Sequence, residues 1–139
     1  MLSAIPLLIL PVAAYAALAL TLGGGLFSAH CHARLTHPLF TFATTGGGAW
    51  PVSAADLLLA VSLVVAFIEL VKAIGDRRIA IANHALSITL FVGCLTAMLL
   101  LPAFATSTFF LITLMVLLDL AAGFIVTMGE APVEPGKRK

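Results

Sequence analysis

Forty consecutive residues, from 79 to 118, contain no Asp, Glu, Lys or Arg, and this uncharged run is the feature that most constrains the fold. A helix needs about 20 apolar residues to cross the roughly 30 Å hydrocarbon layer of a membrane. The run is therefore too long for one crossing, and Pro102 divides it. The sequence predicts two membrane-spanning helices here, at about residues 79–101 and 107–128.

A second uncharged run covers residues 2–27. It begins without the basic residues of a secretory signal peptide, so we interpret it as a retained membrane span. Pro11 lies inside this run and removes one backbone hydrogen bond, which predicts a bend in the helix. The three glycines at 23–25 are expected to end it.

The remaining expected span, residues 53–74, begins at a capping-box pattern in which Ser53 and Asp56 are three positions apart. The sequence therefore predicts an all-α membrane protein with four transmembrane helices in an antiparallel bundle at residues 1–128. A short polar tail follows at residues 129–139. Composition agrees, because 62% of the residues are apolar and 9% are charged, whereas a soluble domain carries roughly a quarter charged residues.

The positive charges are divided unevenly between the two sides of the expected bundle. Arg34 alone lies on one side, in the connection at residues 28–52. The positive-inside rule therefore predicts cytoplasmic termini and a long first connection that faces outward. A compact chain without eukaryotic targeting features favours a bacterial inner membrane. Six basic residues lie on the cytoplasmic side, and the last five of them are candidates for contact with lipid headgroups or a partner: Lys72, Arg77, Arg78, Lys137, Arg138 and Lys139.

The outward-facing connection holds a concentrated group of metal-ligand side chains. His30, Cys31, His32 and His37 lie within eight positions, and imidazole and thiolate ligands suit copper or zinc. The spacing matches no established metal signature, so we favour the alternative that these are polar side chains at headgroup depth. Cys94, the other cysteine, is expected deeper in the membrane, which argues against an internal disulfide.

Three ionisable residues, Glu69, His84 and Asp119, are expected within the spans. Such groups cost several kcal/mol at bilayer depth unless they are paired or neutral, which makes them candidates for function. Helical spacing brings small and polar residues such as Ser62 and Ser87 to the same faces. This intramembrane polar cluster either exchanges protons and binds cations, or holds three helices in register by hydrogen bonds. Haem is less favoured, because the histidines are expected at opposite ends of the bundle.

No sequence pattern indicates catalysis or nucleotide binding, and a net charge of +1 provides no nucleic-acid footprint. We therefore expect a protein that is not an enzyme, has no required cofactor and contacts lipids, other membrane subunits or copies of itself. The favoured function is a non-catalytic accessory or interaction subunit of a larger membrane assembly. One alternative is a proton- or cation-coupled transporter that works as a homo-oligomer through Asp119, Glu69 and His84. The other is a metal or redox site on the outward-facing connection.

Overall fold

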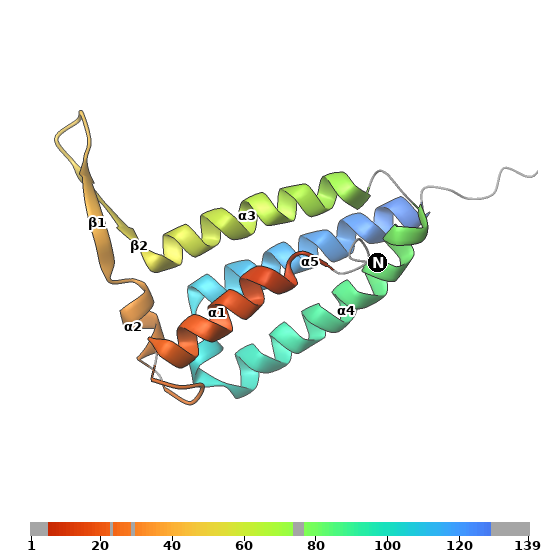
Figure 1. Cartoon of the computed structure of the whole chain (residues 1–139), viewed down its shortest axis with the longest axis horizontal. Helices are drawn as coiled ribbons and strands as arrows, with labels where there is room; N and C mark the ends of the chain where they lie inside the picture. Colours follow the sequence, from red (N-terminus) through yellow and green to blue (C-terminus); the bar gives the residue numbers. More distant parts are fainter. Residues whose placement is uncertain (1–5, 23, 29, 74–76, 129–139) are drawn as a thin grey trace, which may run out of the picture.

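The computed structural model describes residues 6–22, 24–28, 30–73 and 77–128, without the side chains at 73, 77–84 and 126–128. The chain is mostly helical, at 71%. Its elements in order are helix α1 (Ile9–Thr21), helix α2 (Cys31–Leu35), strand β1 (Pro38–Ala43), strand β2 (Ala49–Ser53), helix α3 (Ala54–Ala73), helix α4 (Arg77–Leu100), the short 3-10 helix η2 (Pro102–Phe104) and helix α5 (Ser107–Met128) (Figure 1).

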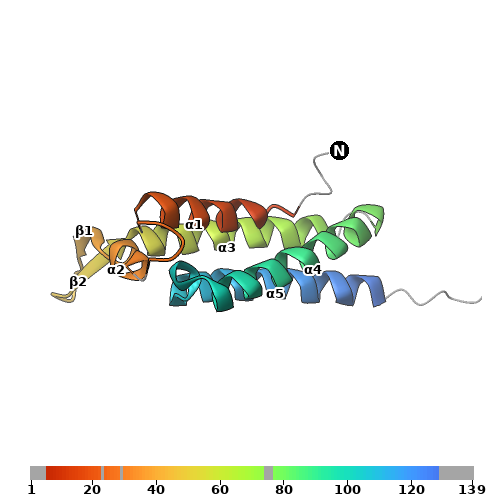
Figure 2. The same ribbon diagram turned by 90° about the horizontal axis from the view of Figure 1, so that it is seen from below.

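The four long helices lie side by side in two layers, α1 with α3 and α4 with α5 (Figure 2). Helix α5 packs chiefly against α4 and α3, and α1 packs against α3 and α5. The β-hairpin formed by β1 and β2 projects from one end of this arrangement (Figure 1). The buried apolar core is concentrated near the same end, where α1, α2, η2 and α5 meet.

Two helical segments are long and apolar enough to cross a membrane, Ala54–Lys72 in α3 and Ser107–Ile125 in α5. Two further apolar helical segments are shorter, Ile9–Thr21 and Ala85–Leu100. The expected spans at 53–74 and 107–128 are thus close to the observed helices. By length and composition, the structure supports two spanning helices of the four that the sequence predicts.

Helix α1 is shorter than the expected span at residues 2–27, with 13 residues. Its end agrees with the expected glycine break, because Gly24 and Gly25 have φ angles of 79° and 114°, a backbone region that favours glycine. Its start changes the role of Pro11, which is the third residue of the helix. An amide in the first turn has no intrahelical acceptor, so this proline removes no helical hydrogen bond and gives no reason for a bend.

The first connection is not the irregular loop that the all-α prediction implies, since it contains α2 and an antiparallel hairpin. In the hairpin, Phe42 pairs with Trp50 and Thr41 pairs with Pro51. The turn is closed by the Thr44 amide and hydroxyl, which both donate to the carbonyl oxygen of Gly48, at 2.8 and 2.7 Å. Alternating aromatic and small residues in β1 favour a strand, and the glycines permit the tight turn.

The predicted capping box at the start of α3 is confirmed. Asp56 Oδ2 accepts hydrogen bonds from the Ser53 amide and hydroxyl at 2.9 and 2.6 Å, and the Asp56 amide donates to Ser53 Oγ at 3.3 Å. These bonds satisfy amides that a helix start leaves without partners. They also fix the junction between β2 and α3, because Ser53 is the last residue of the strand.

Candidate functional site

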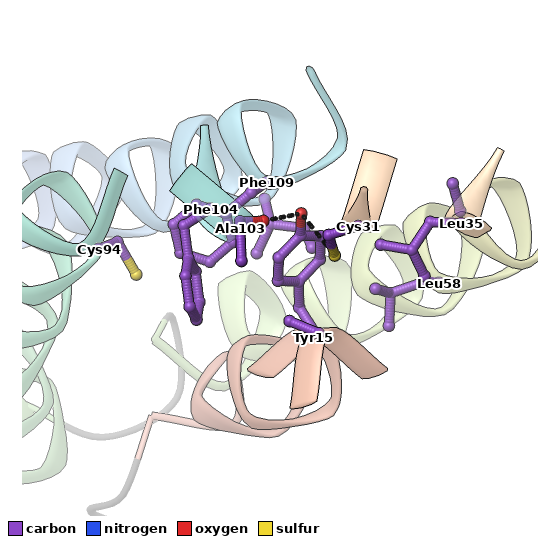
Figure 3. Close-up of a cluster of buried hydrophobic side chains, with 11 residues drawn as sticks. Tyr15, Cys31, Leu35, Leu58, Cys94, Ala103, Phe104 and Phe109 are labelled. Atoms are coloured by element: carbon purple, nitrogen blue, oxygen red, sulfur yellow. Dashed lines mark hydrogen bonds between the residues drawn. The ribbon is translucent and has the colours of Figure 1, made fainter. Parts of the chain in front are cut away.

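The side chain of Tyr15 links four elements of the buried core. Its hydroxyl donates to the carbonyl oxygen of Ala103 at 2.9 Å and lies 2.5 Å from Thr106 Oγ1 and 4.0 Å from Cys31 Sγ (Figure 3). Thr106 Oγ1 also accepts from the Phe109 amide at 3.2 Å, so this threonine is the N-cap of α5. The cluster therefore joins α1 to α2, η2 and α5 through one phenol.

Aromatic rings surround this phenol. The Tyr15 ring lies 4.9 Å from that of Phe109 and 5.5 Å from that of Phe104, measured between centroids. The two phenylalanine rings meet edge to face at 4.7 Å. Burial and these ring contacts make the cluster a structural centre of the fold. The Tyr15 hydroxyl within it is hydrogen-bonded to other groups of the protein. Sequence reasoning missed it, although a lone tyrosine in an apolar helix indicates a phenol that needs a partner.

Glu69, the first residue of the predicted intramembrane cluster, is buried at the start of α1. Its two carboxylate oxygens accept hydrogen bonds from the backbone amides of Leu7 and Leu8, each at 3.0 Å. Leu8 occupies the N-cap position of α1 and provides no side-chain cap. A carboxylate at a helix N-terminus is stabilised by the helix dipole and by the free amides. Glu69 therefore serves as an N-cap that comes from another helix.

Asp119, the second residue of that cluster, is buried between α4 and α5. Its Oδ2 accepts a 2.6 Å hydrogen bond from the Ser87 hydroxyl. Ser62, Glu69, Ser87 and Asp119 are all buried. His84, the third member, lies on α4, but its side chain is outside the described part of the structure. In the structure, Glu69 therefore contacts α1, and Asp119 contacts α4.

Asp119 also lines a cavity of about 190 Å³ between α3 and α5. The other lining side chains are apolar: Leu63, Ala66, Phe67, Leu70, Met115 and Leu118. A carboxylate at the wall of an apolar cavity is a suitable site for a cation or for proton exchange. This cavity is the structural feature that supports a chemical role for Asp119.

The candidate metal ligands of the first connection point in different directions. Cys31 is buried beside Tyr15, whereas His30, His32 and His37 are exposed. Among the residues that the structure describes, no three His, Cys, Asp or Glu side chains lie close enough together to hold a metal ion. The short helix α2 causes this separation, because it turns neighbouring positions to different faces. Cys31 and Cys94 are both free thiols.

The basic residues proposed to contact headgroups or a partner are outside the side chains that the structure describes. Arg77 and Arg78 begin α4, and Lys137, Arg138 and Lys139 belong to the undescribed C-terminal residues. Their contacts therefore stay predictions. On the opposite side, Arg34 and His37 line a hollow of about 440 Å³ at the base of the hairpin.

No protein-family model, no curated protein and no solved structure matches the chain.

Proposed function

We propose that this chain is a four-span integral membrane protein, with both termini cytoplasmic, that acts as a non-catalytic accessory or interaction subunit of a membrane assembly. The observation that carries the membrane part is the exposure of α3. Only 22% of its apolar segment Ala54–Lys72 is buried, and the figure for Ser107–Ile125 is 39%. The core helix of a soluble protein buries most of its apolar surface, whereas a spanning helix exposes it to lipid.

The interaction role is supported by the use of the buried polar groups. Glu69 caps α1, Ser87 donates to Asp119, and the Tyr15 phenol bonds to Ala103. All these contacts hold one helix against another. Polar contacts of this kind stabilise helix association in membranes. A scaffold of this type has much external apolar surface and few polar groups available for catalysis.

An apolar groove of about 430 Å³ between α1 and α4 offers a surface for a transmembrane helix of a partner. It is lined by residues of both helices, among them Val12, Ala16, Leu90 and Gly93. A side chain added at Gly93 would meet no atom within 4 Å, so this position is open. Small residues at such a surface let another helix approach closely.

The test is affinity purification of the tagged chain from a mild detergent at its native expression level, with quantification of every protein that accompanies it. We expect a fixed stoichiometric set of membrane subunits, which reciprocal tagging of one of them recovers. The Gly93→Leu variant fills the groove and should lose these subunits while it retains its own thermal stability. An exposed substitution elsewhere, Leu63→Ala, is the matched control. Recovery of the chain alone would contradict the accessory role.

A second function, proton- or cation-coupled transport as a homo-oligomer, is favoured by the position of Asp119 at the cavity between α3 and α5. In proteoliposomes, an Asp119→Asn variant should then abolish flux driven by a pH gradient. Glu69, which the sequence also predicts as a coupling residue, accepts from the α1 amides and is not among the residues that line this cavity. Glu69→Gln, which retains an acceptor for these amides, should therefore keep the flux. Flux that is equal in wild type, Asp119→Asn and protein-free vesicles would exclude this function.

A further inference from the structure

We propose that the hairpin of β1 and β2 lies flat on the outer membrane interface and binds the lipid surface through an aromatic face formed by Phe40, Phe42 and Trp50. This inference rests on the proposal that α3 spans the membrane. It goes further, because it assigns a lipid-binding surface to a segment outside the spans.

The aromatic face is built by strand alternation and register. Phe40 and Phe42 are two positions apart on β1 and share one face, and Trp50 is the cross-strand partner of Phe42. The centroid of the Phe40 ring lies 5.2 Å from that of the Phe42 ring, and the centroid of the Phe42 ring lies 6.3 Å from that of the Trp50 ring. The exposed fractions are 43%, 55% and 61% for the three side chains. An exposed, continuous aromatic face of this kind indicates an interaction surface.

The position of the hairpin matches the membrane surface. Strand β2 ends at Ser53 and α3 begins at Ala54, so the capping box joins the hairpin directly to the first residue of a candidate span. In Figure 1 the hairpin runs across the direction of α3 and extends past it, away from α4. When α3 stands across the bilayer, the hairpin therefore begins at the membrane surface, beside the end of the bundle.

The chemistry of the segment also fits a lipid interface. Residues 38–55 contain no ionisable side chain, so insertion at headgroup depth desolvates no charge. Arg34 and His37 line the hollow at the hairpin base together with Leu39. A guanidinium there complements the negative phosphate of a headgroup, while tryptophan and other aromatic side chains are favoured at the interface. Apolar, aromatic and cationic groups thus occur together on this segment, as a lipid interface requires.

Trp50 is the only tryptophan, so its fluorescence reports on the hairpin alone. The purified full chain is reconstituted in phosphatidylcholine and phosphatidylglycerol vesicles containing lipids brominated at different depths along the chains. We expect a blue-shifted emission maximum, strong quenching by shallow bromines, weaker quenching by deep bromines and protection from aqueous iodide. Iodide quenching equal to that of a free tryptophan analogue, with no loss from brominated lipids, would overturn the proposal.

Two variants calibrate the depth. Trp50→Phe with Thr41→Trp moves the probe to the opposite face of the hairpin, since Thr41 lies between Phe40 and Phe42 on β1. There we expect weaker bromine quenching and stronger iodide quenching. Trp50→Phe with Phe67→Trp places it on the exposed face of α3, where deep bromines should quench most. If this second probe is deep while Trp50 is in water, the hairpin proposal fails and the spanning proposal stands. If neither probe is quenched by lipid, both fail.

A protein partner on the aromatic face is the other outcome that the experiment separates. In that case Trp50 would be open to iodide in vesicles that contain only this chain and protected only in native membranes. The lipid proposal would then be wrong. The Phe42→Ser variant provides a further check, because it should reduce the blue shift of Trp50 in vesicles while leaving the helical content unchanged.

Discussion

Glu69 Oε2 lies 3.0 Å from the backbone nitrogen of Leu8, which is 61 residues earlier in the chain. A buried carboxylate on α3 thereby supplies the cap that α1 does not provide for itself. The bonds from the Leu7 and Leu8 amides help to accommodate a carboxylate within an apolar helix, since these amides and the positive end of the helix dipole stabilise it. They also make the position of α1 dependent on α3.

We expect Glu69→Ala to lower the free energy of unfolding by about 1–3 kcal/mol, because it leaves two amides of α1 without their acceptor. Glu69→Gln should cost less, since its amide oxygen still accepts one of these bonds. Denaturant unfolding in detergent, followed by circular dichroism, measures both. Hydrogen exchange at Leu7 and Leu8 should be faster in the alanine variant. Unchanged exchange at these amides would contradict the capping role.

Tyr15→Phe removes the phenol oxygen and retains the ring packing. The Ala103 carbonyl and the Thr106 hydroxyl then lose a buried partner, and we expect a loss of about 1–3 kcal/mol in unfolding free energy. The matched control is Phe27→Leu, at an exposed ring, which should change it by less than about 0.5 kcal/mol. Thermal unfolding of wild type, Tyr15→Phe and Phe27→Leu in one detergent measures the difference in stability. Equal midpoints for wild type and Tyr15→Phe would refute the role of the hydroxyl.

The bond between Ser87 and Asp119 predicts a measurable coupling between α4 and α5. In a double-mutant cycle of Ser87→Ala and Asp119→Ala, we expect a coupling energy of about 0.6–1.7 kcal/mol, the range for hydrogen bonds between membrane helices. Unfolding in sodium dodecyl sulfate gives the four free energies. A cycle of Ser87→Ala with Thr96→Ala, nine positions further along α4, provides the control, since the Thr96 hydroxyl bonds within its own helix. Strict additivity in the first cycle would exclude the contact.

The capping box between β2 and α3 predicts that removal of either side chain, Ser53 or Asp56, destabilises the protein. Ser53→Ala and Asp56→Ala should each reduce the unfolding free energy by about 1 kcal/mol, because each leaves amides at the start of α3 unsatisfied. The double variant should cost less than the sum, since both residues serve the same bonds. Ser107→Ala is a control at the exposed start of α5, where Thr106 provides the cap. Full additivity would speak against a shared box.

Cys31 offers a test by pH. Burial raises the pKa of its thiol, and the hydrogen bond between this thiol and Tyr15 offsets part of this rise. The reactive thiolate is therefore scarcer near neutral pH than for an ordinary cysteine, and its labelling rate should increase at higher pH than usual. In a Cys94→Ala background we expect slow maleimide labelling of Cys31. A cysteine introduced at exposed His32, with Cys31→Ser, should label faster, and equal rates and pH profiles would contradict this burial.

Much of the helical architecture was predictable because its signals are local. The uncharged run at residues 79–118 predicted helices close to α4 and α5, the spacing of Ser53 and Asp56 predicted the start of α3, and the glycines after Leu22 predicted the end of α1. The hairpin was not predicted, because the expectation of membrane helices rested on the length of apolar runs and took no account of the two-residue alternation in β1. The proline at position 11 was misinterpreted because its effect depends on where the helix begins.

The sequence by itself determined that the chain is mostly apolar helix, and it identified Glu69 and Asp119 as the buried carboxylates that need partners, since charge and hydropathy are properties of each residue. Only the tertiary structure decided what those partners are. The amides of Leu7 and Leu8, the hydroxyl of Ser87 and the meeting of Tyr15 with Thr106 all join segments far apart in the chain. Helix packing brings these groups within hydrogen-bond distance, and no local pattern of residues encodes which of them will meet.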